Sequence, residues 1–506
     1  MKHIHYIYTL FFGVSALLFF GLAYPHHLHY QEQYQLFLFD SSYMWDVIAL
    51  PGGVADLLGR FSTQFFLYAW VGATIIAILL SVIQLLTLGL ANWGRFYGLS
   101  YVPALLLWIF LLDENALLGG VWAVVLTLSA SLAIDKMADG WTRRILTAML
   151  IPLLFWIAGP VSIVFCILQI RRANHFIWNI ATMLLFVLMP LVLAHCLPVL
   201  DGSLWRGIHY YRYPTVIPTM LWMAVLALVI LLGVQGVKGV KGVKDECTCR
   251  YKSHTPNDIL LTFASFAVVA VVMAVMVWKN SNFKAEKTMK YDFMACHQQW
   301  NRILNTIDEE KPNNQIGVTV QNLALAKQGT LLNKMFEYNQ NGMLGLLPDV
   351  QRDATSPMPT AEAYYHLGLT NIAQRTVFEA QEAILDFQKS ARCFKRLAQT
   401  NLINGDYEVA RKYLMILKKT LFYSDWANET ITLLGNEKAI ANHPEYGTLR
   451  TFAIKKDFLF SDNATPEILE RLYLSNKKNK LAYQYMMASF ILTGDRESFY
   501  KYAQNK

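Results

Sequence analysis

Residues 259–290, ILLTFASFAVVAVVMAVMVWKNSNFKAEKTMK, mark the point at which the composition of the chain changes. An apolar run of about 20 residues, long enough to cross a hydrocarbon core of about 30 Å, ends at Trp278. The chain up to Trp278 holds 15 Lys and Arg and 12 Asp and Glu, whereas the rest holds 29 and 24. The sequence therefore predicts an all-α protein: a polytopic transmembrane helical bundle, 1–278, followed by a soluble domain, 279–506.

The overall composition agrees with this division. The chain is 55% hydrophobic and 16% charged, whereas an average soluble domain has about 25% charged residues. Its net charge of +8 is shared by the two parts, which is unlike the concentrated basic surface of a nucleic-acid-binding protein. We therefore expect no nucleic acid among its partners.

Seven stretches have the length and apolar composition of full membrane spans. They are 6–24, 66–90, 97–113, 116–134, 175–198, 217–236 and 259–278. The first is favoured as a retained helix over a cleaved signal peptide, because its apolar run is long. The first outer loop, 25–65, is aromatic and long for a compact bundle, so we expect it to lie along the membrane surface.

An eighth apolar stretch, ILTAMLIPLLFWIAGPVSIVFCILQI at residues 145–170, has Gly159-Pro160 in its middle. It is either re-entrant, turning back at Gly-Pro beside an internal cavity, or a single Pro-kinked helix. With the hairpin, twelve Lys and Arg lie on the N-terminal side of the membrane and three on the other; with a single crossing, the division is seven against eight. Because these residues stay preferentially in the cytoplasm, the hairpin is favoured.

This assignment predicts a multi-pass protein of the cell inner membrane with a cytoplasmic N-terminus. The basic segment GVQGVKGVKGVKDECTCRYK, residues 233–252, is then also cytoplasmic. The last span carries the chain outward, so the soluble domain 279–506 is expected in the periplasm.

The soluble part has the apolar spacing of paired helices. In ARCFKRLAQTNLINGDYEVARKYLMILKKT, residues 391–420, Phe394 and Leu397 line one helix, Gly405 lies in the turn, and Ala410 lines the return helix. These offsets match the tetratricopeptide (TPR) pattern. We therefore predict a TPR-like α-solenoid over 279–506, whose concave face is a candidate surface for a protein partner.

The candidate catalytic residues are four acids in the outer loops. Asp40 and Asp46 flank Tyr43 and Trp45 in the first loop, where a partly dry carboxylate can act as a general base. Asp113 and Glu114, in the next outer turn, are weaker candidates for the same surface. The alternatives remain open: Asp40 is equally a helix cap and Asp46 a solvated acid, and Asp113 and Glu114 are equally ordinary turn residues.

Two resemblances accompany these observations. The segments LPGGVADLLGRFSTQFF (50–66) and NLALAKQGTLLNKMFEY (322–338) resemble an uncharacterised family of multi-pass membrane proteins from Bacteroidetes. The order of the parts, with a long acidic first outer loop and an outer C-terminal domain, is similar to GT-C glycosyltransferases. That resemblance implies lipid-linked sugar substrates, Asp40 and then Asp46 as the catalytic acids, and a divalent metal as cofactor, although no paired-acid motif occurs in this loop.

The sequence leaves two functional hypotheses. The first is a GT-C-like transferase that uses lipid-linked sugars or a related envelope precursor, with membrane lipid as its environment. The second is a non-enzymatic, membrane-anchored TPR scaffold that recruits envelope partners. A transporter is disfavoured because the spans hold almost no charged residues.

Overall fold

The computed structural model describes residues 4–504 except 92, 139, 173–175, 200–201, 240–255, 350–352, 354, 386–387 and 455–464. The chain forms two compact units, unit 1 (Met1–Phe283) and unit 2 (Lys284–Lys506). The described residues form helices and turns, with isolated bridge pairs but no strand, which confirms the all-α class. Most of the predicted cytoplasmic segment 233–252 lies outside the described residues.

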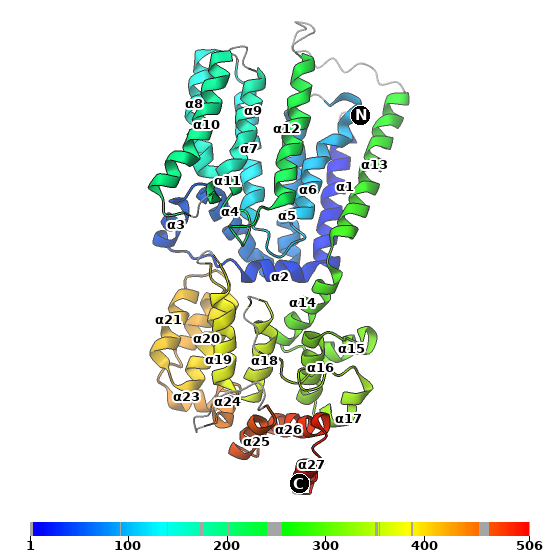
Figure 1. The fold of residues 1–506 in the computed structure, drawn as a ribbon, viewed down its shortest axis with the longest axis vertical. Coiled ribbons are helices and arrows are strands. Elements are labelled where there is room, and N and C mark those ends of the chain that lie inside the picture. Colours follow the sequence, from blue (N-terminus) through cyan, green and yellow to red (C-terminus); the bar gives the residue numbers. More distant parts are fainter. Residues whose placement is uncertain are drawn as a thin grey trace. The chain divides into compact units, whose positions relative to one another are not determined.

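Unit 1 contains helices α1 to α13 (Figure 1). Their bounds are Ile4–Leu18 (α1), Pro25–Gln33 (α2), Ser41–Ile48 (α3), Gly53–Thr63 (α4), Ala69–Gly89 (α5), Val102–Phe110 (α6), Leu118–Asp135 (α7), Trp141–Ala158 (α8), Ile163–Arg172 (α9), Phe176–Cys196 (α10), Ser203–Arg206 (α11), Thr219–Gly239 (α12) and Pro256–Asn280 (α13). The long helices run side by side, and α2 lies across them at one end.

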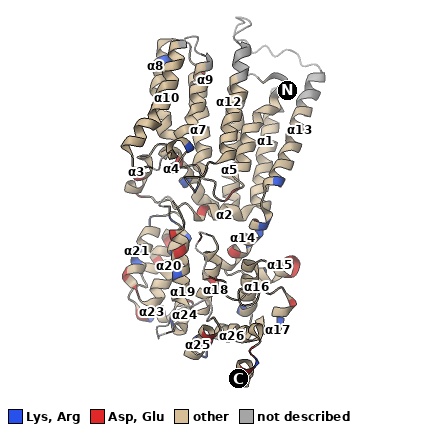
Figure 2. Cartoon of the chain, viewed as in Figure 1, with Lys and Arg blue, Asp and Glu red and all other residues tan. Residues whose placement is uncertain are grey.

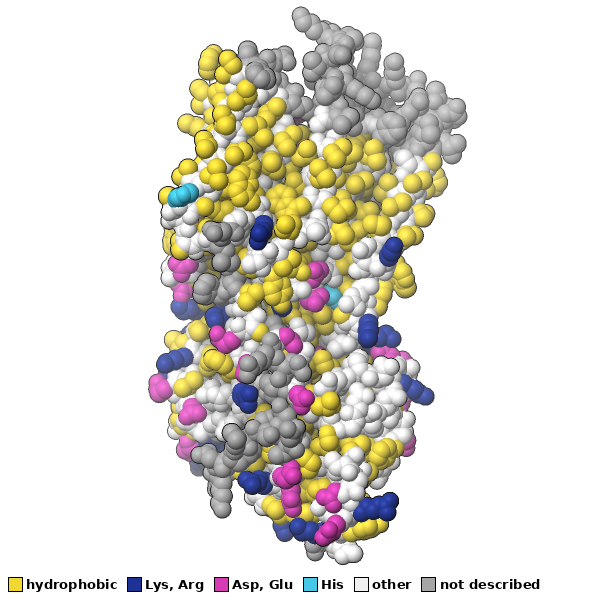
Figure 3. Space-filling model, in the orientation of Figure 1, with side chains coloured by type: hydrophobic (Ala, Val, Ile, Leu, Met, Phe, Trp, Pro, Cys, Tyr) yellow, Lys and Arg dark blue, Asp and Glu magenta, His cyan; other side chains and the backbone are white. Residues whose placement is uncertain are grey.

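Six apolar helical stretches in the described part of the chain are long enough to cross a membrane: His5–Ala23, Ala69–Gly89, Leu118–Asp135, Trp141–Ile170, Ile177–Cys196 and Phe263–Asn280. Large apolar side chains are exposed along α1, α5, α10 and α13. Figure 2 shows few charged residues on these helices, and Figure 3 shows a largely hydrophobic face on unit 1. A surface of this kind is expected where lipid replaces water.

The predicted spans 97–113 and 217–236 contain shorter apolar helices, Tyr97–Phe110 and Thr219–Gly233. In the first, a 3-10 helix over Gly94–Tyr101 precedes α6, which has a proline near its start. A 3-10 helix rises about 2.0 Å per residue against about 1.5 Å in an α-helix. The two pieces together therefore reach roughly 30 Å, although neither is a full-length α-helix.

The apolar stretch Trp141–Ile170 is not straight. Helix α8 ends at Ala158 and is followed by Gly159, whose φ is positive at 68°, and a short 3-10 helix leads into α9. Near the far ends of the two helices, Arg143 Nη2 donates to Gln169 Oε1 at 3.1 Å, so the chain reverses direction. Helix α8 alone is about 27 Å long at 1.5 Å per residue, because it begins at Trp141, before the apolar stretch 145–170.

Unit 2 consists of helices α14 to α27. Their bounds are Phe283–Cys296 (α14), Trp300–Glu310 (α15), Gln315–Lys327 (α16), Leu331–Lys334 (α17), Pro357–Leu367 (α18), Thr370–Glu382 (α19), Ala391–Asn404 (α20), Tyr407–Leu417 (α21), Ser424–Ile431 (α22), Glu437–Asn442 (α23), Tyr446–Phe452 (α24), Thr465–Ser475 (α25), Lys480–Thr493 (α26) and Arg496–Ala503 (α27). The pairs α18–α19 and α20–α21 are helical hairpins that turn at Gly368 and Gly405. Phe394, Leu397 and Ala410 are buried.

Candidate functional site

The first loop of unit 1 is folded into helices α2, α3 and α4, which cover one end of the bundle. We call this region, together with residues 111–117 and 202–218, the capped end. Gln31 of α2 donates its amide to Leu111 O and Asp113 O, and the backbone N of Leu117 donates to Tyr210 O. Three segments that are distant in the sequence therefore meet here.

Asp40 directly precedes α3, and Asp46 lies in the second turn of that helix. Asp40 is the N-cap, and its Oδ1 accepts from the backbone N of Ser42 at 3.0 Å. Asp46 is exposed, next to Trp45, which is 70% exposed. The carboxylate of Asp40 thus has a structural role, whereas that of Asp46 faces solvent or membrane surface.

The most buried acid of the capped end is Asp56 on α4, which is fully buried. Its Oδ2 lies 2.7 Å from Arg60 Nη2 and 3.1 Å from His209 Nδ1. Burial by itself would raise the pKa of Asp56, but the opposite charge of Arg60 and the contact with His209 lower it below its usual value. Asp56 is therefore ionised, and Arg60 neutralises its charge. Such a buried ion pair suits a structural role better than that of a general base.

One close backbone approach and two hydrogen bonds hold the first loop against the bundle. A Cβ on Gly59 would lie 2.4 Å from the backbone N of Gly119. The backbones of α4 and α7 are therefore too close to leave room for a side chain at this position. The backbone N of Gly52 donates to Trp156 O at 2.7 Å, and Trp156 Nε1 donates to Ile48 O at 3.0 Å. The ends of α3 and α8 are thereby joined beside the reversal between α8 and α9.

A cavity of about 370 Å³ opens next to this reversal. Its lining is almost entirely apolar and comes from the 3-10 turn, α9 to α12 and the segment before α12: Pro160, Ile163, Phe186, Trp205, Arg206, Ile217 and Trp222. Trp205 and Ile217 are 38% and 54% exposed, so the cavity is open to the surroundings. Arg206 is its single charged lining residue, and one of its nitrogens donates to Thr215 O at 3.0 Å.

Asp113 and Glu114 lie in another part of the capped end, between α6 and α7. Asp113 accepts from Asn115 through Oδ1 and from the Tyr211 hydroxyl through Oδ2, the latter at 2.7 Å. Glu114 lies 3.7 Å from His27 Nε2 on α2. These two acids tie α2 and the segment before α12 to the α6–α7 turn.

The described residues do not fit the divalent metal that the GT-C resemblance implies. In the described part of the chain, no group of three or more His, Cys, Asp or Glu side chains is placed to hold a metal ion. Asp40 in particular is committed to the start of α3.

Unit 2 contains a buried ionic network among α14, α18 and α20. Arg392 donates to both carboxylate oxygens of Asp292, at 2.6 and 2.8 Å, and Arg396 donates to Glu362 at 2.6 Å. Burial would raise the pKa of Glu362, but Arg396 and Arg392 lower it to about 2. Burial lowers the pKa of His366, 3.8 Å from Glu362, well below its usual value. The network joins three helices and leaves no solvent-facing reactive group.

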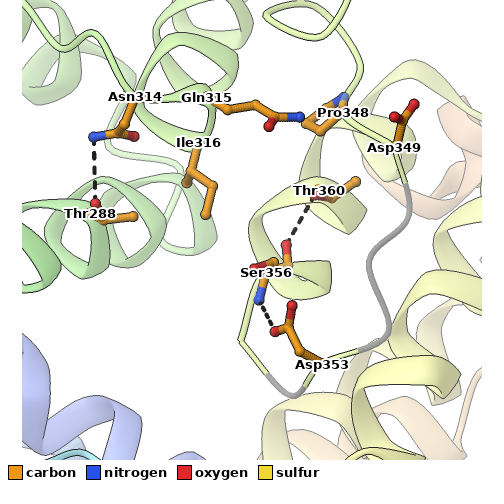
Figure 4. Close-up of a pocket in the computed structure, with 9 residues that line it drawn as sticks. All are labelled: Thr288, Asn314, Gln315, Ile316, Pro348, Asp349, Asp353, Ser356 and Thr360. Carbon is orange, nitrogen blue, oxygen red and sulfur yellow. Dashed lines mark hydrogen bonds between the residues drawn. The ribbon is translucent and has the colours of Figure 1, made fainter.

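A second open pocket, of about 370 Å³, lies in unit 2 (Figure 4). It is mostly polar and is lined by Thr288, Asn314, Gln315, Ile316, Pro348, Asp349, Asp353, Ser356 and Thr360. Several of these groups are already engaged: Asn314 Oδ1 caps α16, and Asp353 Oδ1 accepts from the backbone N of Ser356 at 2.7 Å. The pocket is a polar recess between α14, α16 and α18.

The pairing of Asp56 with Arg60 is visible in the sequence as an i, i+4 spacing on a helix. The contribution of His209 is not, because it comes from a segment about 150 residues later. The residues that line the apolar cavity could not be predicted either, because they also come from separate segments of the chain. The Gly159-Pro160 turn did indicate where the cavity lies. The assignment of Asp40, Asp46, Asp113 and Glu114 to catalysis stays a prediction.

Comparison with known proteins gives a family but no activity. No curated protein and no solved structure matches the chain. A family model described as "Family of unknown function (DUF6057)" matches residues 2–506. The chain therefore belongs to this uncharacterised family over practically its whole length.

Proposed function

We propose that the protein is an inner-membrane enzyme of the GT-C type that takes a lipid-linked sugar, or a related anionic amphiphile of the envelope, at the apolar cavity of unit 1. The observation that carries this proposal is the cavity itself, a recess of about 370 Å³ with apolar walls and a single arginine. Ligand pockets have typical volumes of 300–1,000 Å³, apolar walls and a few polar groups.

The chemistry of the lining suits an amphiphile with a negative headgroup. Trp205 and Trp222 offer large apolar surfaces, and Arg206 places a cation at the same recess. Arginine pairs well with phosphate because its guanidinium presents several donors in one plane. An isoprenoid or acyl chain would therefore lie against the tryptophans while its phosphate pairs with Arg206.

Of the four candidate acids, Asp46 is the one that we propose as the base of the transfer. It is exposed on α3, and the end of α3 is hydrogen-bonded to Trp156, four residues before Pro160 of the cavity wall. In this role Asp46 would accept the proton of an acceptor hydroxyl as its oxygen bonds to C1 of the sugar and the bond from C1 to the lipid phosphate breaks, so that the lipid phosphate leaves as an anion paired with Arg206. Asp40 would position α3 through its cap.

The proposed sidedness follows from charge. The N-terminus and the connections that hold most Lys and Arg of unit 1 are cytoplasmic in this proposal, and the capped end and unit 2 are periplasmic. Substrate would thus enter from the outer leaflet.

The test is a photo-crosslinking experiment with the full chain in nanodiscs that contain a diazirine-labelled polyprenyl phosphate. Ile217→Trp adds bulk inside the cavity lining, and we expect it to reduce labelling roughly tenfold, as for a loss of about 1.4 kcal/mol in binding. Ile177→Trp is the matched control, because Ile177 on α10 is 83% exposed and is not part of the lining. Equal labelling of both variants and wild type would contradict the proposal.

Asp46→Asn separates binding from transfer. We expect it to keep the crosslink and to abolish the envelope glycan phenotype of a complemented deletion strain, at normal protein level. Retention of the phenotype by both Asp46→Asn and Asp40→Asn would remove the enzymatic part of the proposal.

A second candidate function is a membrane-anchored TPR-like scaffold, which the open polar pocket of unit 2 favours. Helical hairpins such as α18–α19 and α20–α21 stack in such arrays and present a surface to partners. If function survives every change at the cavity but is lost on removal of 284–506, the scaffold is the better description.

A further inference from the structure

Arg212, in the segment between α11 and α12, is a buried cation with an unusual set of partners. It is 5% exposed. Its guanidinium carbon lies 4.1 Å from the centre of the Tyr34 ring and 4.7 Å from that of Tyr213. Its Nη2 donates to the Tyr213 hydroxyl, and its backbone N donates to Asn115 O at 2.9 Å.

Among the described residues, no carboxylate oxygen lies within 4.0 Å of the Arg212 guanidinium. By contrast, Arg60, Arg392 and Arg396 each have a carboxylate within that distance. The two acids on the adjoining turn are engaged elsewhere. Asp113 is held by Asn115 and Tyr211, and Glu114 lies next to His27. The side chains in contact with the guanidinium are those of Tyr34 and Tyr213, and Arg212 therefore keeps its positive charge.

Two of the guanidinium nitrogens, Nε and Nη1, are buried and have no hydrogen-bond partner among the described residues. Nη1 lies on the same side of the Nε–Cζ bond as Cδ, whereas the Nε hydrogen points to the Nη2 side, so Nε and Nη1 donate to separate acceptor oxygens, such as those of a phosphate or carboxylate. Buried donors are nearly always satisfied in folded proteins, so these groups point to a ligand with several acceptor oxygens.

We infer that Arg212 is the centre of an anion site at the capped end, and that the site takes a phosphate group whose oxygens accept from the guanidinium next to the two tyrosines. The inference is separate from the apolar cavity, whose lining does not include Arg212. The phosphate is that of a free ion or of a phospholipid headgroup; both present the same oxygens. Tyr213 is the less buried of the two rings, so its side chain is the one that would move to admit the ion.

The test uses the full chain in a neutral detergent with a chloride buffer. Inorganic phosphate is added at constant pH and ionic strength, and the melting temperature is followed by tryptophan fluorescence. A ligand that binds only the folded state raises the melting temperature in proportion to the logarithm of its concentration above Kd. We expect this rise for the wild type, and Arg212→Gln should shift the midpoint to roughly tenfold higher phosphate or beyond.

A parallel arm identifies the source of the phosphate. The protein is placed in phosphatidylcholine nanodiscs with or without phosphatidic acid, in phosphate-free buffer. Stabilisation by phosphatidic acid alone assigns the site to a lipid headgroup, and stabilisation by inorganic phosphate alone assigns it to the free ion.

Arg375→Gln is the matched control, because Arg375 is 54% exposed in unit 2 and its loss removes the same charge. Arg212→Lys serves if Arg212→Gln fails to fold; it keeps the charge but loses the separate Nε and Nη1 donors, so its response to phosphate should be weaker than that of the wild type. The inference is overturned if neither phosphate nor phosphatidic acid stabilises the wild type, or if the Arg212 variants respond as Arg375→Gln does.

The two proposals can fail separately. Loss of lipid labelling in Ile217→Trp would leave the response to phosphate unchanged.

Discussion

At the scale of single residues, burial decides which charged groups have a structural role. Asp40 and Asp56 are both acids of the first loop, yet one caps a helix at the surface and the other is fully buried against Arg60. In unit 2, Glu362 is buried between Arg392 and Arg396. Removing one partner of a buried pair leaves the other charge uncompensated, which costs about 3–5 kcal/mol.

Glu362 gives unit 2 a defined acid sensitivity. Its pKa is lowered from 4.5 to about 2 in the folded chain, so its contribution to stability is complete above about pH 4.5 and is lost as the pH falls towards 2. We expect Glu362→Gln to destabilise the fold by about 3–5 kcal/mol at pH 7 and to flatten this part of the pH profile, as measured by melting temperature between pH 2 and 7.

The control for this change is Glu408→Gln, because Glu408 is 83% exposed and lies 3.7 Å from Arg411. Exposed pairs of this kind contribute little, so its profile should follow that of the wild type. An unchanged profile for Glu362→Gln would mean that the network does not support the fold.

At the scale of elements, the sequence predicts where helices begin and break more reliably than how they pack. Asp40 is the N-cap of α3, as its sequence context predicts, and Gly52, a residue type common in turns, precedes α4. The contact of α4 with α7 was not predicted, since it depends on Gly59 and Gly119 meeting across about 60 residues of sequence. Close backbone approach is a property of the pair of helices, not of either sequence alone.

Gly59→Ala tests this approach. The added Cβ would lie 2.4 Å from Gly119 N and 2.8 Å from Gly119 Cα, so α4 must move away from α7. We expect a loss of about 1–3 kcal/mol, the usual effect of overpacking, together with faster proteolysis of the first loop.

Gly89→Ala is the matched control. Gly89 ends α5, and a Cβ there would meet Leu132 Cδ1 at 3.5 Å, an ordinary contact. Alanine favours helix over glycine, so this variant should be as stable as the wild type. A Gly59→Ala protein of equal stability would show that α4 is free to shift.

At the scale of the whole molecule, the reversal between α8 and α9 decides the sidedness of everything that follows it. A chain that turns back at Gly159 returns to the side from which α8 started, as the contact between Arg143 and Gln169 requires. The Lys and Arg distribution then becomes strongly asymmetric, twelve against three, which is the pattern that orients membrane proteins.

Reporter fusions test this topology. Alkaline phosphatase fused after Lys290 should be active and a fluorescent protein fused there dark, because we expect that position in the periplasm. A phosphatase fusion after Arg172 should be inactive if α8 and α9 form a hairpin in the membrane, and active if the segment crosses once. A dark phosphatase after Lys290 would contradict the proposed orientation and the envelope-facing function with it.

The sequence by itself determined the helical class, the change of composition near Trp278, the apolar stretches and the capping of α3. These are local properties, set by the spacing of apolar residues, by side chains that bond their own backbone, and by the position of Gly and Pro. They need no knowledge of what a segment contacts.

Only the tertiary structure decided that His209 joins Asp56, that Arg212 lies against Tyr34, and that an apolar cavity forms beside Pro160. Each depends on side chains brought together from segments far apart in the chain. Periodicity reports which face of a helix is apolar, but it does not report which other helix meets that face, because many pairings bury the same apolar area.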